Sequence, residues 1–320
     1  MISTSKPILY DPNYPINIPH EYDGTYQPNR FHSWFLRAIF YLIPSFISII
    51  GICLRIFRNF QSASIPMIRQ PFLAIIMPPR HPFYIYIHNL DNFPLYEIHS
   101  LTCKPSNCPR AVLYIHGGGF VSGDFAGFKA FIAEIAVRLS CPVFFPQYRL
   151  APEHSAMDLI ADVIEAYNFI TTSYTEIVLM GDSAGACLCL WLLHSLQSSK
   201  ISSVILYSPI TDLNGTGDSM VQLASIDPIL VPSIVKTVMQ YVNDLPSPLM
   251  LPPFNIRPRM CIFVGAYEIM LDDSRRFVAR PDFQHAYLHI IPKGFHCWQN
   301  FINLPEAQMT LDMTSVFILS

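Results

Sequence analysis

Seven short apolar runs, separated by helix-like segments, set the strongest limit on how this 320-residue chain can fold. Several runs are continuously apolar, a pattern typical of strands that are covered on both faces. Strand-like and helix-like segments follow one another in turn, which favours a mainly parallel sheet with helices on both faces. The expected strands lie within 83–87, 111–119, 142–148, 176–181, 203–209, 260–265 and 286–292, and the expected helices within 127–139, 156–171, 184–197, 232–242 and 273–280.

This alternation starts near residue 61 and predicts a single α/β domain over residues 61–320. Hydrophobic residues make up 51% of the chain, so a domain of this length can bury a large core. No internal repeat or linker divides it. Residues 1–60 are therefore expected to form a separate N-terminal segment.

Residues 38–54 of that segment, "AIFYLIPSFISIIGICL", contain no charged side chain. The run is shorter than the roughly 20 apolar residues that a spanning helix needs, and Pro44 interrupts it. Two interpretations remain open. The run is either a buried or lid helix of the domain, or an anchor or interfacial helix whose partner is a membrane surface.

Charge and cysteine content exclude several other classes of function. A formal net charge of −3 with 13% charged residues leaves no basic surface for nucleic acid. The eight cysteines show no C-x-x-C pair or other metal-ligand spacing, so we interpret them mostly as small buried apolar residues in a reducing compartment. We expect no metal and no cofactor, and an intracellular location, either cytoplasmic or membrane-associated through residues 38–54.

The pentapeptide Gly181-Asp182-Ser183-Ala184-Gly185 has the form G-x-S-x-G and lies between an expected strand and an expected helix. A sharp strand-to-helix turn favours glycines on both sides of the serine, because side chains there would cover its hydroxyl. The helix that follows adds its N-terminal N–H groups and positive dipole end beside Ser183. The motif indicates a nucleophilic serine, and the alternative is an ordinary tight turn.

A second glycine-rich stretch, "YIHGGGFVSGD" at 114–124, also directly follows an apolar run. Gly117, Gly118 and Gly119 allow close backbone approach to a ligand and can aim successive N–H groups into one concavity. An oxyanion hole requires this arrangement, although a flexible turn or a phosphate-binding loop would also use glycines. No Lys-Ser/Thr pair follows and no G-x-G-x-x-G is present, so nucleotide binding is the weaker explanation.

A serine is a weak nucleophile at neutral pH, so this interpretation requires a base and a carboxylate that orients the base. Where a serine lies on such a turn, both partners come later in the chain, in loops after subsequent strands. His296 fits best among the eleven histidines, because it lies in the loop after the last expected strand. We interpret His285 and His289 as structural, and expect hydrogen-bonding roles for His116 and His194.

The orienting acid is expected after the preceding strand, which ends at Gly265. Glu268 follows that glycine by three residues and is our first choice. Asp272 is the alternative acid, since Asp272 and Asp273 lie further out, where a helix would begin. Either aspartate could instead cap that helix.

These motifs together resemble the hormone-sensitive-lipase-like branch of the α/β-hydrolases, which includes bacterial short-chain esterases and arylacetamide deacetylases. The resemblance covers about residues 105–310 and implies an α/β-hydrolase fold. Six motifs match in the family's order: HGGGF (116–120), YRLAPEH (148–154), GDSAG (181–185), SPITDL (208–213), VGAYEIMLDDS (264–274) and FHCWQ (295–299).

The resemblance implies a Ser183 nucleophile, a His296 base, and Glu268 at an acid position that is usually aspartate. It further implies that the backbone amides of Gly118, Gly119 and Ala184 form an oxyanion hole. Supporting roles fall on His116, Gly117, Gly181, Asp182 and Gly185, and on the stretch 148–154.

The expected function is hydrolysis of small to medium lipophilic acyl esters without a cofactor. A ligand-binding protein on the same fold that has lost turnover is the main alternative. An impaired member with a scaffolding or membrane role is a third. Family receptors of the ligand-binding kind typically lose the histidine, whereas serine, histidine and an acid are all present in this chain.

Overall fold

The computed structural model describes residues 8–10, 79–101, 108–292 and 294–320. Most of the N-terminal segment, including the apolar run 38–54, lies outside these described residues. The boundary near residue 60 lies outside them as well. The lid and membrane interpretations of this segment, and the division of the chain at that point, therefore stay predictions.

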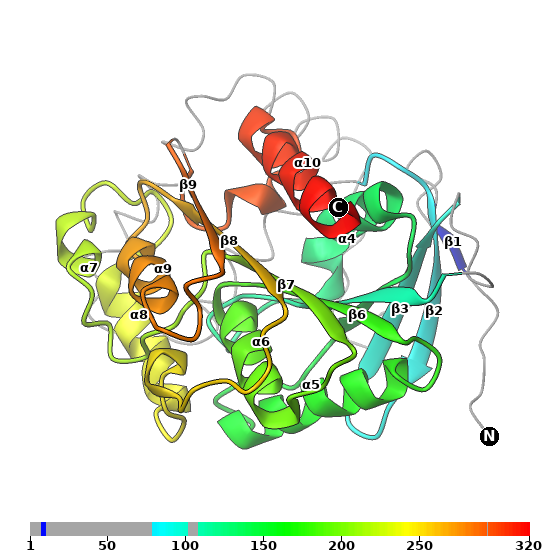
Figure 1. Ribbon diagram of the computed structural model, residues 1–320, viewed down its shortest axis with the longest axis horizontal. Helices are drawn as coiled ribbons and strands as arrows, with labels where there is room; N and C mark the ends of the chain where they lie inside the picture. The colour runs from blue at the N-terminus through cyan, green and yellow to red at the C-terminus, as the bar shows by residue number, and fades with distance from the viewer. Residues whose placement is uncertain (1–7, 11–78, 102–107, 293) are drawn as a thin grey trace, which may run out of the picture.

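A nine-stranded sheet runs through the described part of the chain, in the order β1-β2-β3-β5-β4-β6-β7-β8-β9 (Figure 1). Every pairing from β5 to β9 is parallel, and the pairings of β1, β2, β3 and β5 with one another are antiparallel. The mainly parallel sheet is confirmed. The strands are β1 (Ile8–Tyr10), β2 (Phe83–Asn89), β3 (Pro94–Ser100), β4 (Arg110–Ile115), β5 (Val143–Pro146), β6 (Glu176–Asp182), β7 (Ile201–Tyr207), β8 (Arg259–Gly265) and β9 (Tyr287–Ile291).

Helices cover both faces of the sheet, and each face has its own hydrophobic cluster (Figure 1). Helices α4 and α10 contribute to one cluster, and α5, α6, α8 and α9 contribute to the other. The helices are α4 (Phe125–Leu139), α5 (Ala156–Ile170), α6 (Ser183–Leu196), α7 (Ser219–Gln222), α8 (Pro232–Met239), α9 (Leu271–Val278) and α10 (Pro305–Leu319), with short 3-10 turns η2 (Gln240–Val242), η3 (Pro248–Met250) and η4 (Trp298–Asn300).

All seven expected strands and all five expected helices are present, with their ends shifted by a few residues. Strands β1 and β3 and helices α7 and α10 were not predicted. β3 reads "PLYEIHS", in which Glu97 and His99 weaken the apolar signal. α10 buries Thr310 and Thr314 beside Ala307 and Leu311, so its core stripe does not read as hydrophobic.

The YRLAPEH stretch is held against α5 by charge. Asp162 of α5 is almost fully buried and makes an ion pair of 2.7 Å with Nη2 of Arg149. The α5 helix begins with a capping box, in which the Ser155 hydroxyl accepts from the Asp158 N–H and the Asp158 carboxylate accepts from the Ser155 N–H. This stretch therefore has a fixed position beside the glycine loop that follows β4.

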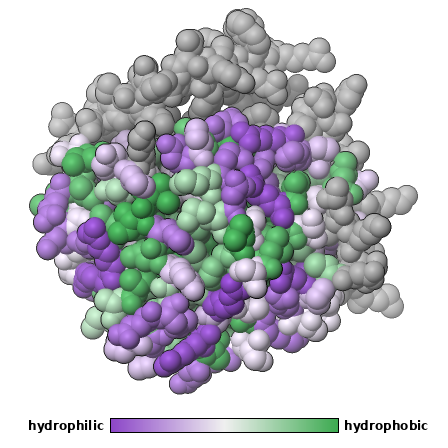
Figure 2. Space-filling view, turned by 45° about the horizontal axis from the view of Figure 1, so that its top comes forward, coloured by the Kyte–Doolittle hydropathy of each residue, from purple (hydrophilic) through white to green (hydrophobic). Residues whose placement is uncertain are grey.

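No helix in the described ranges combines the length and the apolar character needed to cross a membrane. The face drawn in Figure 2 shows hydrophobic side chains interspersed with hydrophilic ones. Exposed large hydrophobic residues occur in several separate elements, including α5, α7, β9 and α10.

Replacing Leu179 by alanine tests the central strand. Leu179 in β6 is fully buried, and its truncation is expected to lower the free energy of unfolding by about 3 kcal/mol through lost burial and a residual cavity. Leu319→Ala is the matched control, because Leu319 is 58% exposed and its truncation should change stability by less than about 0.5 kcal/mol. Urea denaturation followed by circular dichroism measures both. Equal effects would contradict the assignment of β6 to the core.

Candidate active site

The turn between β6 and α6 holds Ser183 in a left-handed backbone conformation. The φ angle of Ser183 is 51°, which non-glycine residues rarely adopt, so the surroundings must enforce it. A Cβ on Gly185 would overlap the carbonyl oxygens of Ile115 and His116, and one on Gly181 would lie 2.9 Å from the carbonyl oxygen of Gly185. Only glycine fits at both positions. The helix therefore starts directly against the end of β4.

Ser183, His296 and Glu268 form a continuous chain of hydrogen bonds. Nε2 of His296 lies 2.9 Å from Oγ of Ser183, and its Nδ1 lies 2.7 Å from Oε2 of Glu268. Because an ionised carboxylate only accepts, we assign the imidazole proton to Nδ1, which leaves Nε2 to accept from the serine hydroxyl. Ser183 starts α6 after β6, Glu268 follows β8 and His296 follows β9, so all three lie beyond the carboxyl ends of parallel strands.

The second oxygen of Glu268 is also fixed. Its Oε1 accepts from the Gly265 N–H at 2.6 Å and from the Ser208 hydroxyl at 3.0 Å. The same hydroxyl oxygen accepts from the N–H of Cys297, next to His296, at 3.1 Å. Ser208 thus joins the acid loop to the histidine loop. Ser208 was not among the sequence-based candidates, although its position directly after β7 indicates a place at the carboxyl end of the sheet.

Burial and charge act in opposite directions on His296. Burial alone lowers the pKa of the imidazole, but the hydrogen bond to Glu268 and the charges of Glu268, Asp227 and Asp182 raise it, and the net shift is upward. The cation that forms when the ring accepts a proton is therefore stabilised at this site. Asp227 was absent from the sequence-based candidates because it lies in a loop without a strand before it.

The glycine loop after β4 turns sharply at Gly118 and Gly119, whose φ angles are 114° and 63°. The carbonyl oxygen of Gly118 accepts from the Ser122 N–H at 3.0 Å and from the Val121 N–H at 3.2 Å. Within the described part of the chain, the N–H groups of Gly118 and Gly119 have no acceptor. The N–H of Ala184, in the first turn of α6, also has no intrahelical partner.

Asp182 links this loop to the serine turn. Its fully buried carboxylate accepts from the Gly117 N–H at 2.8 Å, the Tyr114 hydroxyl at 2.7 Å and the Asn300 amide at 3.2 Å. Burial raises its pKa despite these donors. The Tyr148 hydroxyl donates to the His116 carbonyl at 2.7 Å, which holds the loop from the other side. Asn300, which donates to Asp182, was also absent from the sequence-based candidates.

The other histidines considered above contact different groups. Nδ1 of His116 lies 2.8 Å from the Gly117 oxygen, and burial lowers the pKa of this ring to about 4, so it is neutral at physiological pH. His194 packs edge-on against Phe254, His285 Nε2 lies 3.2 Å from the Pro258 oxygen, and His289 stacks on Phe263.

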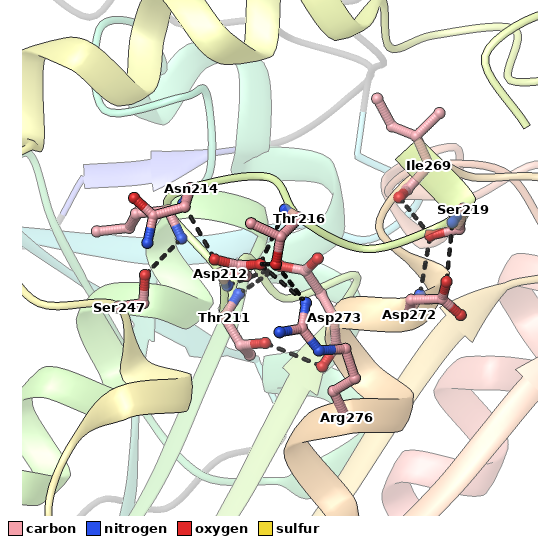
Figure 3. Close-up of polar contacts among 11 residues, drawn as sticks. Thr211, Asp212, Asn214, Thr216, Ser219, Ser247, Ile269, Asp272, Asp273 and Arg276 are labelled. Atoms are coloured by element: carbon pink, nitrogen blue, oxygen red, sulfur yellow. Dashed lines mark hydrogen bonds and ion pairs between the residues drawn. The ribbon is translucent and has the colours of Figure 1, made fainter. Parts of the chain in front are cut away.

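The expectation that Asp272 or Asp273 caps a helix is wrong. The N-cap of α9 is Met270, without a side-chain hydrogen bond, and both aspartates lie inside the first turn. Their carboxylates instead reach the chain after β7: Asp273 accepts from the N–H groups of Thr211 and Asp212 at 2.8 Å, and Asp272 from that of Ser219 at 2.8 Å (Figure 3). The hydrogen-bond donors to these carboxylates are therefore N–H groups of that neighbouring loop and not those at the end of α9. Asp272, the alternative acid, contacts Ser219 and Arg275. Glu268 is the carboxylate that is hydrogen-bonded to His296.

The described residues contain no group of three or more His, Cys, Asp or Glu side chains arranged to hold a metal ion. Six of the cysteines fall within the described residues, and four of these, Cys141, Cys187, Cys189 and Cys261, are buried. Burial raises the pKa of Cys187 and Cys189, both in α6, which keeps their thiols protonated.

Residues 112–300 match the model of the alpha/beta hydrolase fold family. The chain therefore belongs to this family. Over 233 residues, which are 67% of this chain and 76% of the relative, it is 30% identical to an esterase of Acinetobacter venetianus. It is 28% identical to the esterase LipU of Mycobacterium tuberculosis over 65% of this chain and 77% of that protein.

Solved structures agree on the fold. A crystal structure of an esterase from the bacterial hormone-sensitive lipase family aligns with a TM-score of 0.76 at 24% identity, covering 85% of this chain and 96% of that one.

In sequence, mouse hormone-sensitive lipase is 29% identical over 43% of this chain and 20% of its own length. The hormone-sensitive-lipase-like branch expected from the motifs is confirmed.

Replacing Gly185 by alanine is expected to disable the serine turn. The added methyl group overlaps backbone oxygens that cannot move without displacing β4, so Ser183 shifts and turnover with p-nitrophenyl butyrate should fall by about a hundredfold or more. Gly127→Ala in α4 is the control, since alanine is favoured over glycine in a helix. A Gly185→Ala protein with unchanged kcat would contradict the enforced turn.

The pH dependence of kcat/KM is expected to report the raised pKa of His296. Only the neutral imidazole accepts the serine proton, so kcat/KM should rise through an acidic limb centred above the ordinary histidine value of about 6.5. Glu268→Gln removes the charge that raises this pKa, so its limb should move to lower pH while kcat falls. A limb that stays in place in the variant would contradict the assigned cause.

Proposed function

We propose that this protein hydrolyses carboxylic esters, with Ser183 as nucleophile, His296 as general base and Glu268 as the carboxylate that orients the base. The observation that carries the proposal is the hydrogen-bond chain from Ser183 through His296 to Glu268 on a turn of left-handed backbone. The esterase names of the relatives support the same class of reaction.

In the first half of the reaction, Nε2 of His296 takes the proton of the Ser183 hydroxyl while Oγ attacks the ester carbonyl carbon. A tetrahedral intermediate forms with its negative charge on the former carbonyl oxygen. The imidazolium is stabilised by Glu268, and it then donates its proton to the departing alkoxide. The products of this half are an alcohol and an acyl group esterified to Ser183.

In the second half, water replaces the alcohol. The neutral imidazole of His296 takes a proton from water, whose oxygen attacks the acyl carbon. The second tetrahedral intermediate collapses when Ser183 leaves and recovers its proton from the imidazolium. The carboxylic acid is released, and the hydrogen-bond chain is restored.

The negative charge of both intermediates falls to the amides of Gly118, Gly119 and Ala184. Their N–H groups come from the glycine loop and the first turn of α6, and they have no other partner in the described part of the chain. Preorganised amides of this kind stabilise an oxyanion without reorientation, and the loss of one such donor costs about 3 to 4 kcal/mol of transition-state stabilisation.

The substrates are small to medium lipophilic acyl esters. Support comes from the apolar side chains around the glycine loop, where Val238 of α8 lies so close that a Cβ on Gly119 would be 3.3 Å from its Cγ2. Val121, Ala151 and Val238 form one hydrophobic cluster, against which Ile234 and Tyr241 also pack. Apolar packing of this kind beside the glycine loop favours uncharged acyl or alcohol groups.

Association with a membrane surface is part of the proposal only through residues 38–54, which lie outside the described residues. An intracellular location likewise remains a prediction from the cysteine content. Carbonate extraction of full-length protein beside a variant lacking residues 1–60 tests the membrane contact. Supernatant recovery of both would favour a lid.

Ser183→Ala tests the function directly. Hydrolysis of p-nitrophenyl acetate, butyrate and longer esters by wild-type protein is expected to fall to the background rate in this variant, because no other hydroxyl is hydrogen-bonded to His296 in the described residues. Ser233→Ala is the matched control, since Ser233 is exposed on α8 and should be neutral. An absence of serine-dependent turnover at every chain length would refute the esterase proposal, and the order of rates reports the length of the pocket.

A further inference from the structure

Ile269, the residue that follows Glu268, is held at its N–H and at its carbonyl by two side chains of one distant segment. The N–H of Ile269 donates to Oδ2 of Asp227 at 2.9 Å, and the Ile269 carbonyl accepts from the Ser219 hydroxyl at 2.7 Å. Ser219 also accepts from the Asp272 N–H at 3.0 Å, and Figure 3 shows it between Ile269 and Asp272. In a free loop after a strand, the N–H and the carbonyl of Ile269 would be hydrogen-bonded to water.

Asp227 divides its two carboxylate oxygens between two loops. Oδ1 accepts from the N–H groups of Ile229 and Leu230 at 2.9 and 2.8 Å, within its own loop, and Oδ2 accepts from Ile269 in the acid loop. The residue is only 5% exposed. A buried carboxylate costs free energy unless donors surround it, so this side chain can keep its charge here only with these three amides in place.

The segment that carries Asp227 also reaches the other half of the site. Eleven positions further on, Val238 of α8 packs against Gly119 of the glycine loop. The acid loop and the glycine loop are thus braced by one stretch of chain that runs from Asp227 into α8. Asp227 contacts the residue next to the acid and not the acid itself.

We propose that Asp227 is a positioning residue for the catalytic acid: by binding the Ile269 N–H it fixes the backbone beside Glu268, and so the direction in which Glu268 holds His296. This inference rests on the proposed esterase function. Ser219 supports the next peptide group along the chain, because its hydroxyl donates to the Ile269 carbonyl.

Electrostatics give Asp227 a second effect on the same histidine. Burial raises the pKa of its carboxyl to about 6, against the opposing effects of His296 and the three amides. Conversely, the negative charges of Glu268, Asp227 and Asp182 raise the pKa of His296. Loss of the Asp227 charge therefore lowers the pKa of His296, and displacement of Glu268 acts in the same direction.

Asp227→Asn keeps the shape of the side chain and removes its charge and one acceptor oxygen. With p-nitrophenyl butyrate, kcat is expected to fall by about tenfold to a hundredfold, because a small displacement of a catalytic group is that costly. KM should change by less than roughly threefold, since Asp227 is buried and its carboxylate is occupied by backbone amides. The acidic limb of the kcat/KM profile should move to lower pH.

Asp218→Asn is the matched control, because it removes an exposed charge from the same segment. Unchanged kcat and an unchanged acidic limb in Asp227→Asn would overturn the proposal. A double-mutant cycle with Glu268→Gln tests the route of the effect: if Asp227 acts through Glu268, its replacement should have little further effect in that background. A full additional loss there would also overturn it.

A second readout does not depend on turnover. The proton on Nδ1 of His296, shared with Glu268, should give a low-field proton NMR signal that Glu268→Gln abolishes and Asp227→Asn weakens or shifts. If the wild-type protein has no esterase activity but shows this signal and its loss, the esterase proposal fails and the positioning role stands. An unaltered signal in Asp227→Asn refutes the positioning role.

Ser219→Ala covers the case in which Asp227→Asn does not fold. It removes the hydroxyl that donates to the Ile269 carbonyl and accepts from the Asp272 N–H, and it should lower kcat with little change in KM. Thermal unfolding measured beside activity separates this loss from a loss of stability. Ser219→Ala with the wild-type kcat and the wild-type Nδ1 signal would show that the backbone of Ile269 needs no such support, which contradicts the proposal.

Discussion

The close approach of α6 to the end of β4 is the contact on which the rest of the site depends. Gly185 lies against the carbonyl oxygens of Ile115 and His116 with no room for a methyl group. That contact places the first turn of α6 beside the glycine loop that continues from β4. The strained serine and the amides of the glycine loop are therefore held together by backbone packing, which tolerates little change.

Around this fixed centre, polar contacts fix the parts that come from elsewhere in the chain. Asp182 holds Gly117 of the glycine loop, and Ser208 joins Glu268 to the loop of His296. Asp227 and Ser219 hold the N–H and the carbonyl of Ile269, the residue after Glu268. Each is a buried polar group with partners on a different loop, so the site is a set of loops cross-linked at short distances.

Most strands, most helices and the family were predictable because they depend on local patterns. Continuous apolar runs identified the parallel strands, and the glycine spacing at 181–185 identified the serine turn. α10 was missed because threonines occupy part of its buried stripe, and Ser208, Asn300 and Asp227 were missed because their partners are distant in sequence. A lone polar residue in a loop gives no signal of the partner that it meets after folding.

The three groups of the hydrogen-bond chain differ in how centrally the strands that precede them lie in the sheet. Ser183 follows β6, which pairs with a strand on each side, whereas His296 follows β9, the last strand in the order. Terminal strands open locally at a lower free-energy cost than central ones. The histidine can therefore separate from the serine while the central sheet stays folded, which makes the base the weak point of the site under heat or denaturant.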